Sequence, residues 1–304
     1  MSPVTTLLLL VFAALAFATL IVRRMKRNRP VEELENRIRS WWIMAALFFG
    51  LVLLGKGGAV ALFAVVSYLA VKEYFTMIPI RRVDRRIIFW AYLSILPQYG
   101  WAYAGWYEMF IIWIPVYTFL LLPFRQVLTG ETKGFVESTG KVQWGLMLFV
   151  FSISHLAFLA TLPPAEGAGN VGGVETLLYL VVLTELNDIY QYLFGKRFGK
   201  RKIVPKVSPN KTVEGFLGAL TATTATALAL TFLTPFTLPE ALMAGMLIAS
   251  AGFVGDVVVS MIKRDVGIKD SGTLIPGHGG ILDRIDSLTY TAPLFFHYLY
   301  YLHY

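Results

Sequence analysis

The chain has 304 residues, of which 56% are hydrophobic and only 15% are charged, and its mean hydropathy is +0.62. A soluble domain of this length carries more charge and does not read apolar from end to end, so the composition excludes a soluble protein and predicts a polytopic membrane protein. The formal net charge is +8 at pH 7, and there is no cysteine, which excludes disulfides, thiolate nucleophiles and thiolate metal sites.

The first apolar run, residues 5–22, is followed at once by the basic stretch RRMKRNR. Ala16-Phe17-Ala18 resembles the cleavage site of a signal peptide, but the positive residues lie after the apolar run and not before it. This order of charge predicts a retained first helix whose N-terminus lies outside the cell.

Further apolar runs approach the ~20 residues that cross a bilayer as a helix. They predict an all-α, polytopic integral membrane protein with about nine to ten transmembrane helices. The second run is short enough for a re-entrant hairpin. The ten segments are 5–22, 41–54, 59–78, 87–104, 106–123, 144–161, 175–194, 213–233, 240–262 and 285–303.

Basic residues gather in alternate loops, which contain 25 of the 27 Lys and Arg residues. Alternating spans place these loops on one side of the membrane, which the positive-inside rule identifies as the cytoplasm. The net charge therefore reflects topology in a bacterial-type inner membrane. No nucleic-acid-binding motif accompanies it, and we expect no nucleic-acid partner. The five loops are 23–40, 79–86, 124–143, 195–212 and 263–284.

The position of these loops also suggests how the chain is organised. We expect an N-terminal membrane helix with a basic segment (1–40), then a set of N-terminal transmembrane helices (41–174). The remaining residues, 175–304, form the expected catalytic transmembrane domain, because its two cytoplasmic loops are richer in polar residues than topology requires.

The first of these loops lies within residues 187–215. Asp188 lies near the inner end of a span, and a basic, glycine-punctuated loop with the turn VSPNKT follows it. Ser208 and Thr212 are candidate helix caps, and the free N–H groups of a helix N-terminus attract anions. Taken alone, the charge favours a topology signal or a contact with anionic lipid head groups.

The second loop follows Asp256, which lies inside an apolar span about two turns before its cytoplasmic end. A carboxylate costs about 2.5–3.5 kcal/mol near the middle of a bilayer and less toward the interface, so it requires a cation, a partner or water. One interpretation is a simple ion pair with Lys263 or Arg264. The other is a ligand site.

The neighbouring residues favour the ligand site. Asp283 and Asp286 are three residues apart and share a face if the last helix begins there. Gly277, Gly279 and Gly280 allow the backbone to approach a ligand closely. Oxygen ligands among lysines and glycines are typical of a Mg²⁺ ion that carries nucleotide phosphates. The Walker A pattern of a P-loop is missing from the sequence.

The stretch of residues 260–286 resembles, without a break, the sequence pattern of the phosphatidate cytidylyltransferases, or CDP-diacylglycerol synthases. The upstream FGKRFGK and VSPNKTVEG are similar to the same family, so the resemblance covers residues 188–286. Gln191 departs from it, because the family commonly has a small residue there. The pattern is Ser260-x2-Lys263-Arg264-x4-Lys269-Asp270-x-Gly272-x2-Ile275-Pro276-x-His278-Gly279-Gly280-x2-Asp283-Arg284-x-Asp286.

The resemblance implies that CTP and phosphatidic acid react to give CDP-diacylglycerol and pyrophosphate, with Mg²⁺ as cofactor. It also implies a homodimer, for which the small residues of TATTATALA offer a packing face. Asp256 and Asp283 would be the main metal ligands, with Asp286 and Asp188 next. The groups expected near phosphate are Lys206, Lys211, Lys263, Arg264, Lys269, Ser208, Gly279 and Gly280; Asp256, Asp283, Lys263 and Arg264 form the expected catalytic set.

Some polar residues keep two interpretations. His278 either contacts phosphate or orders its turn, and Asp270 either binds metal or holds a lysine. Glu185 either supports Asp188 from one turn away or makes a hydrogen bond in helix packing. His155, His297 and His303 are expected to be structural or interfacial.

Two other functions remain open at this stage. The protein could transfer a cytidylyl group, or a phosphoryl group as a CTP-dependent kinase, to another lipid such as a polyprenol. Alternatively it could be a transporter or channel, because acids within spans also bind transported cations. Transport sites, however, tend to lie near the midplane between paired halves, whereas these residues crowd one membrane face.

Overall fold

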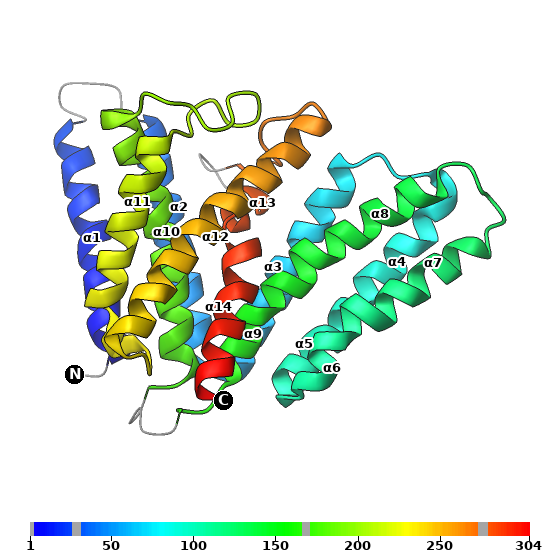
Figure 1. The fold of residues 1–304 in the computed structure, drawn as a ribbon, viewed down its shortest axis with the longest axis horizontal. Coiled ribbons are helices and arrows are strands. Elements are labelled where there is room, and N and C mark those ends of the chain that lie inside the picture. Colours follow the sequence, from blue (N-terminus) through cyan, green and yellow to red (C-terminus); the bar gives the residue numbers. More distant parts are fainter. Residues whose placement is uncertain (1–2, 26–31, 166–170, 273–278) are drawn as a thin grey trace.

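The computed structural model describes residues 3–25, 32–165, 171–272 and 279–304, and within these ranges the chain is an assembly of packed helices (Figure 1). The described part contains only an isolated antiparallel bridge between Lys202 and Thr212 and no larger sheet. The predicted all-α fold is confirmed. The helices are α1 Pro3–Met25, α2 Glu32–Leu53, α3 Lys56–Met77, α4 Arg85–Leu93, α5 Ile95–Ala104, α6 Tyr107–Ile112, α7 Phe119–Val127, α8 Phe135–Leu146, α9 Ser152–Thr161, α10 Gly173–Phe198, α11 Val213–Ala229, α12 Leu238–Asp265, α13 Leu282–Ile285 and α14 Leu288–His303.

Five helical stretches of the described chain are long and apolar enough to cross a membrane. Each of the ten apolar segments expected from the sequence is largely helical, but α11 and α14 have only 17 and 16 residues. The nine to ten spans therefore stay a prediction, as does the division into three domains. The five stretches are Pro3–Met25, Lys56–Met77, Tyr107–Val127, Phe135–Thr161 and Leu238–Asp265.

Prolines interrupt two of the expected spans. Pro97 has no N–H to donate to the carbonyl of Leu93, and the segment divides there into α4 and α5. Pro115 lies in a π-helical turn, Trp113–Thr118, that joins α6 to α7. The indole Nε1 of Trp113 donates to the carbonyl oxygen of Ser94 (3.0 Å), so the two interrupted helices are linked at their breaks.

The last third of the chain packs as a bundle of α10, α11, α12 and α14. Asn187 of α10 lies in its interior, fully buried, and accepts a hydrogen bond from Thr223 of α11 (3.1 Å) while donating to the carbonyl of Ala249 in α12 (3.4 Å). A buried amide with partners on two other helices fixes their relative register, because losing either partner leaves a polar group unsatisfied.

The small-residue run of α11 is used inside this bundle. Thr223 and Ala227 are buried, and Tyr179 of α10 donates to the carbonyl of Ala227 (3.3 Å). A side chain at Gly245 of α12 would collide with the backbone of Thr224. Thr223 and Ala227 are therefore covered by α10 and α12 of the same chain. The homodimer, with the small residues of α11 as its packing face, stays a prediction.

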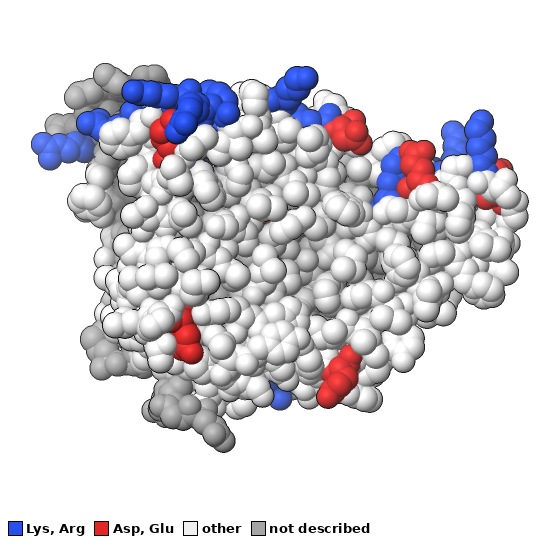
Figure 2. Space-filling model, in the orientation of Figure 1, with Lys and Arg blue, Asp and Glu red and all other residues white. Residues whose placement is uncertain are grey.

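One end of the molecule is basic. Figure 2 shows most visible Lys and Arg side chains along one edge, above a largely uncharged body. In the same orientation the loops between α10 and α11, α3 and α4, and α7 and α8, together with the C-terminal end of α12, lie at that edge (Figure 1). The described parts of four of the five loops that the sequence predicts on one side of a membrane thus share one end of the fold (Figure 1).

Candidate active site

Three acids reach one region from different elements near the basic end. Asp188 lies on α10, Asp256 on α12, and Asp286 in the turn between α13 and α14. Gly255 makes the approach of α12 to that turn possible, because a Cβ there would lie 2.6 Å from the carbonyl oxygen of Asp286. Close backbone packing thus brings these acids together.

Lys211 lies among these acids. Its ammonium forms an ion pair with Asp256 and donates a hydrogen bond to Oε1 of Gln191 (2.7 Å). Asp188 and Asp286 also interact electrostatically with Lys211 and with each other. One ammonium therefore faces three carboxylates. We call Asp188, Asp256, Asp286 and Lys211 the acid cluster.

This arrangement corrects one sequence-based interpretation. Asp256 pairs with Lys211, and not with Lys263 or Arg264, which follow it on the same helix. It also accepts a hydrogen bond from Ser260 (3.2 Å). Lys263 pairs with Asp283 instead, at 2.6 Å. Sequence proximity suggested the wrong partner because Lys211 reaches α12 from a distant loop.

The loop before α11 folds back and so presents Lys211. The amide of Val213 donates to the carbonyl of Arg201 (2.9 Å), and Oε2 of Glu214 accepts from the amides of Lys200 and Arg201. Thr212 caps α11 by accepting from the amide of Gly215 (3.1 Å), as predicted. Ser208 lies in the preceding turn and is not the cap.

Lys211 stays charged in this environment. Burial alone would lower the pKa of its ammonium, but the carboxylates of Asp256, Asp188 and Asp286 outweigh burial and raise the pKa above its ordinary value. A persistent positive charge among carboxylates can interact with a carboxylate oxygen or with the oxygen of an anionic ligand.

Asp283 forms a second, adjoining group. Its Oδ1 accepts from Lys263, and its Oδ2 accepts from the amides of Ser271 (2.9 Å) and Gly280 (3.0 Å) and from the Ser271 hydroxyl (3.1 Å). Burial would raise the pKa of Asp283, but Lys263 and these donors hold the pKa below its usual range. Asp283 and Asp286, though three residues apart, therefore have different hydrogen-bond partners, since α13 ends between them.

Glu73 of α3 also belongs to this second group, and sequence reasoning missed it. Its carboxylate accepts hydrogen bonds from the amides of Ile281 and Leu282 and from the hydroxyl of Ser271. An acid one turn before the end of an apolar run was the only available signal. We call Glu73, Ser271, Asp283 and Lys263 the loop anchor.

The remaining expected residues vary in their surroundings. Arg264 donates to the carbonyls of Val207 and Ile268, so it joins the two polar loops. Lys206, Lys269 and Asp270 are exposed. Gly279 has a φ of +80°, and a Cβ there would lie 2.5 Å from Oδ2 of Asp283, so glycine is required on both grounds. His278 and Gly277 lie outside the described residues.

The other histidines and Glu185 lie in different places. His155 is fully buried, with its ring 5.2 Å from that of His297 and 4.9 Å from that of Phe110, which fits a packing role. His303 lies 3.6 Å from a carboxylate oxygen of Glu240. Glu185 interacts electrostatically with Arg284 and Asp286, so it lies close to the acid cluster.

The acid cluster has the donors that a hard cation prefers. Carboxylate oxygens from Asp188, Asp256 and Asp286 are the ligand type that Mg²⁺ selects. In the described part of the chain, no three His, Asp or Glu side chains are placed so that they could together bind a metal ion. The carboxylate oxygens are engaged by Lys211 and by hydroxyl groups such as that of Ser287, 2.8 Å from Asp188. The donor set fits Mg²⁺ in its chemistry.

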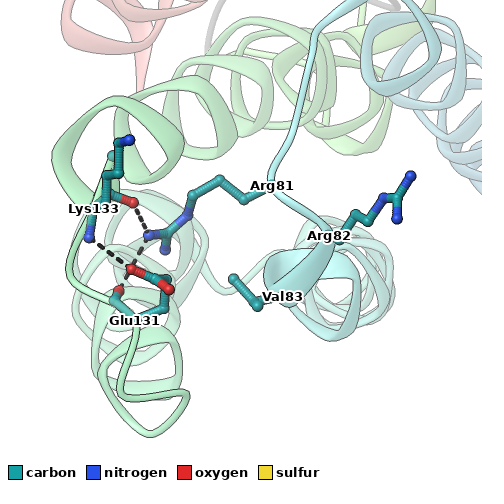
Figure 3. Close-up of a pocket in the computed structure, with 6 residues that line it drawn as sticks. Arg81, Arg82, Val83, Glu131 and Lys133 are labelled. Carbon is teal, nitrogen blue, oxygen red and sulfur yellow. Dashed lines mark hydrogen bonds between the residues drawn. The ribbon is translucent and has the colours of Figure 1, made fainter.

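A separate polar group lies on the loops after α3 and α7 (Figure 3). Arg81 donates to the backbone carbonyls of Lys133 (2.5 Å) and Glu131 (3.1 Å) and forms a 2.6 Å ion pair with buried Asp84. The shallow depression beside Arg82 is lined by none of the expected site residues. This cluster ties two loops of the basic end together.

Comparison with known proteins gives a consistent result. The sequence model of the cytidylyltransferase family matches residues 35–302. The chain is 32% identical to proteins named phosphatidate cytidylyltransferase from Staphylococcus haemolyticus, over 83% of this chain and 94% of that protein, and from Staphylococcus aureus strain COL, over 85% and 96%. It is 44% identical to the uncharacterized protein YnbB of Escherichia coli K12, over 95% and 96% of the two chains.

Proposed function

The chain belongs to the cytidylyltransferase family, and on this premise we propose that it transfers the cytidylyl group of CTP to phosphatidic acid, giving CDP-diacylglycerol and pyrophosphate with Mg²⁺ as cofactor. An enzyme of this kind, acting in CTP-dependent nucleotidyl transfer to a lipid, is supported by the relatives named phosphatidate cytidylyltransferase. The choice of phosphatidic acid and of Mg²⁺ is our proposal.

The observation that carries the proposal is the acid cluster beside the loop anchor. Both groups come from residues of the family's motif region, apart from Glu73, and both combine carboxylates with a buried or half-buried lysine. They lie next to exposed lysines at the basic end, where a lipid head group and a nucleotide from solution can meet. A transporter requires no such lysines among its cation ligands, so this composition favours phosphate chemistry.

The reaction needs little acid–base chemistry. A phosphate oxygen of the lipid, already anionic near neutral pH, forms a bond to the α-phosphorus of CTP, and the bond from that phosphorus to the bridging oxygen of pyrophosphate breaks. The difficulty is to bring two anions together, so catalysis is mainly positional and electrostatic. Lys211, Lys263 and Arg264 reduce the repulsion, and exposed Lys206 and Lys269 extend the basic surface toward solvent.

The metal would add the remaining positive charge. When bound, Mg²⁺ neutralises phosphate oxygens and orients the triphosphate. We keep Asp256 and Asp283 as the main proposed ligands, with Asp286 and Asp188 beside them. Oδ1 of Asp283 would bind the metal beside Lys263 or in its place, and a displaced ammonium would be available to a phosphate oxygen. Asp256 would bind the metal in the same way beside Lys211, its ion-pair partner.

The place of the site in the cell is also a proposal. We infer that the basic end faces the cytoplasm of a bacterial inner membrane, with the N-terminus outside, because the positive-inside rule predicts it. A reporter fused within residues 166–170 should then report from outside and one near Lys202 from inside. The opposite result would exclude a cytoplasmic site. We also propose a homodimer, which cross-linking in native membranes would test.

The decisive experiment measures the product. Purified protein in mixed micelles receives CTP with phosphatidic acid, a polyprenol or a polyprenyl phosphate, with Mg²⁺ or with a chelator. We expect a CDP-lipid and pyrophosphate from phosphatidic acid, and no reaction with the chelator. Release of CDP with a phosphorylated lipid would identify a kinase, and product only from polyprenyl phosphate would identify another acceptor. Cation flux in proteoliposomes without any CTP reaction would favour the transporter.

A further inference from the structure

Glu73 connects two parts of the chain that are far apart in sequence. It lies on α3, in the part of the chain outside the expected catalytic domain, and its hydrogen-bond partners follow 198 to 209 residues later. Both carboxylate oxygens are used: Oε1 accepts from the amide of Ile281 (2.9 Å), and Oε2 accepts from the amide of Leu282 (3.0 Å) and the hydroxyl of Ser271 (3.0 Å).

These bonds supply acceptors for backbone amides at the start of α13. The four-residue helix α13, Leu282–Ile285, begins with amides that have no partner within the helix. Glu73 supplies acceptors for two successive amides at this point, so a residue of α3 does the work of a helix cap. Asp283, the first acid of α13, is oriented by the same turn, because its own Oδ2 accepts from the amide of Gly280.

Ser271 joins the two carboxylates directly. Its hydroxyl lies 3.0 Å from Oε2 of Glu73 and 3.1 Å from Oδ2 of Asp283. Gly280 lies against the same atoms, and a Cβ there would collide with both Ser271 and Glu73. Ser271, Gly280, Ile281 and Leu282 therefore closely surround the Glu73 carboxylate.

We propose that Glu73 is a positioning residue for the transfer reaction: through Ser271 and the amides of Ile281 and Leu282 it holds Asp283, and with it Lys263, in place. The proposal rests on the function proposed above. It makes α3 part of the active-site framework and assigns Glu73 no contact with substrate. Misplacement of catalytic groups by about 1 Å can cost on the order of 100-fold in rate, so loss of this anchor should reduce turnover well beyond any effect on folding.

The test compares Glu73→Gln and Glu73→Ala with the control Glu137→Gln, which removes an exposed acid paired with Lys141 on α8. The two amides bind different oxygens of Glu73, and glutamine replaces one of these oxygens with an NH2 donor, so one amide loses its acceptor. Three quantities are measured for each purified variant: the melting temperature, kcat and KM for CTP, and the hydrogen–deuterium exchange of peptides covering residues 279–287.

For Glu73→Gln we expect kcat to fall by about 10-fold or more, with KM for CTP changed less, because a displaced loop affects the transition state more than ground-state binding. Exchange should rise in peptides covering residues 279–287 and stay unchanged in those of α11. Ser271→Ala should have a smaller effect, because two of the three bonds to Glu73 remain. Glu137→Gln should match the wild type in all three measurements.

Wild-type kcat together with wild-type exchange in Glu73→Gln would overturn the inference. So would a fall in melting temperature with unchanged kcat, which would assign Glu73 a purely structural role. If Glu73→Ala fails to fold, Glu73→Gln still decides the question. A wild-type protein inactive on every lipid acceptor would refute the proposed function instead, and the exchange measurement would then show separately whether the anchor exists.

Discussion

Lys211 and Gln191 share a hydrogen bond of 2.7 Å, and the same ammonium pairs with Asp256, so one lysine from a loop joins α10 to α12 at the acid cluster. Gln191 is buried, and its amide nitrogen lies 3.5 Å from Oδ1 of Asp188. It occupies the position where the family resemblance leads us to expect a small residue. The glutamine therefore adds a polar bridge between the lysine and an acid.

Replacing Gln191 with leucine should lower kcat/KM for CTP by about 10-fold. The substitution removes the acceptor that holds Lys211, and a hydrogen bond to a charged group contributes about 1.5–3 kcal/mol. The steady-state rate of CDP-lipid formation checks this. Gln143→Leu serves as the control, because Gln143 is also buried and hydrogen-bonded, to the carbonyl of Phe119. If both variants lose activity equally, the effect belongs to buried glutamines in general.

Asp283→Asn should reduce turnover by about 100-fold or more. Asparagine keeps the shape, but its single oxygen can serve either Lys263 or the donors around Oδ2, and its NH2 group then faces the other set. Asp265→Asn, at the exposed end of α12, is the matched control and should keep wild-type turnover. Turnover in Asp283→Asn equal to that of the control would refute the role assigned to Asp283.

Asp84→Asn should destabilise the protein by about 1–3 kcal/mol at neutral pH, because Arg81 and Ser138 lose a buried carboxylate partner. Burial would raise the pKa of Asp84, but Arg81 and Ser138 outweigh it and lower the pKa. The Asp84 carboxylate therefore stabilises the fold at any pH above its pKa in the unfolded chain, which is about 4. This stabilisation is lost as the pH falls through the lower pKa of the folded state.

Melting temperatures between pH 3 and pH 8 test this prediction. The gap between wild type and Asp84→Asn should be constant above about pH 5 and should narrow below about pH 4. Glu137→Gln, which changes an exposed ion pair, should melt like the wild type at neutral pH. A gap that widens in acid would show that Asp84 is not the group responsible.

Gly255→Ala should destabilise the fold by about 1–3 kcal/mol, because the added methyl group meets the carbonyl oxygens of Asp286 and Ser287. It should also lower activity by moving the turn that carries Asp286. Gly140→Ala is the control: Gly140 lies within α8 with open space around it, so alanine should be neutral or stabilising by up to about 1 kcal/mol. Thermal unfolding of the two variants in the same detergent separates the outcomes.

The sequence by itself determined the apolar, helical architecture, the basic loops and the segment that carries the family's motif. These properties depend on hydropathy along a continuous run and on a motif with short spacings, so they can be read without knowing how helices pack. Thr212 as the cap of α11 is of the same kind, since its partner Gly215 is only three residues away.

Only the tertiary structure decided which residues meet. The choice of Lys211 over Lys263 as the partner of Asp256, the bonds from Glu73 to residues about 200 positions later, and the covering of the small residues of α11 by α10 and α12 all depend on contacts between distant segments. From the sequence alone, many of the basic residues in this chain are equally suitable as ion-pair partners for a given acid. Packing of the helices selects among them, because an ion pair or hydrogen bond forms only between groups that the backbone brings within about 3 Å.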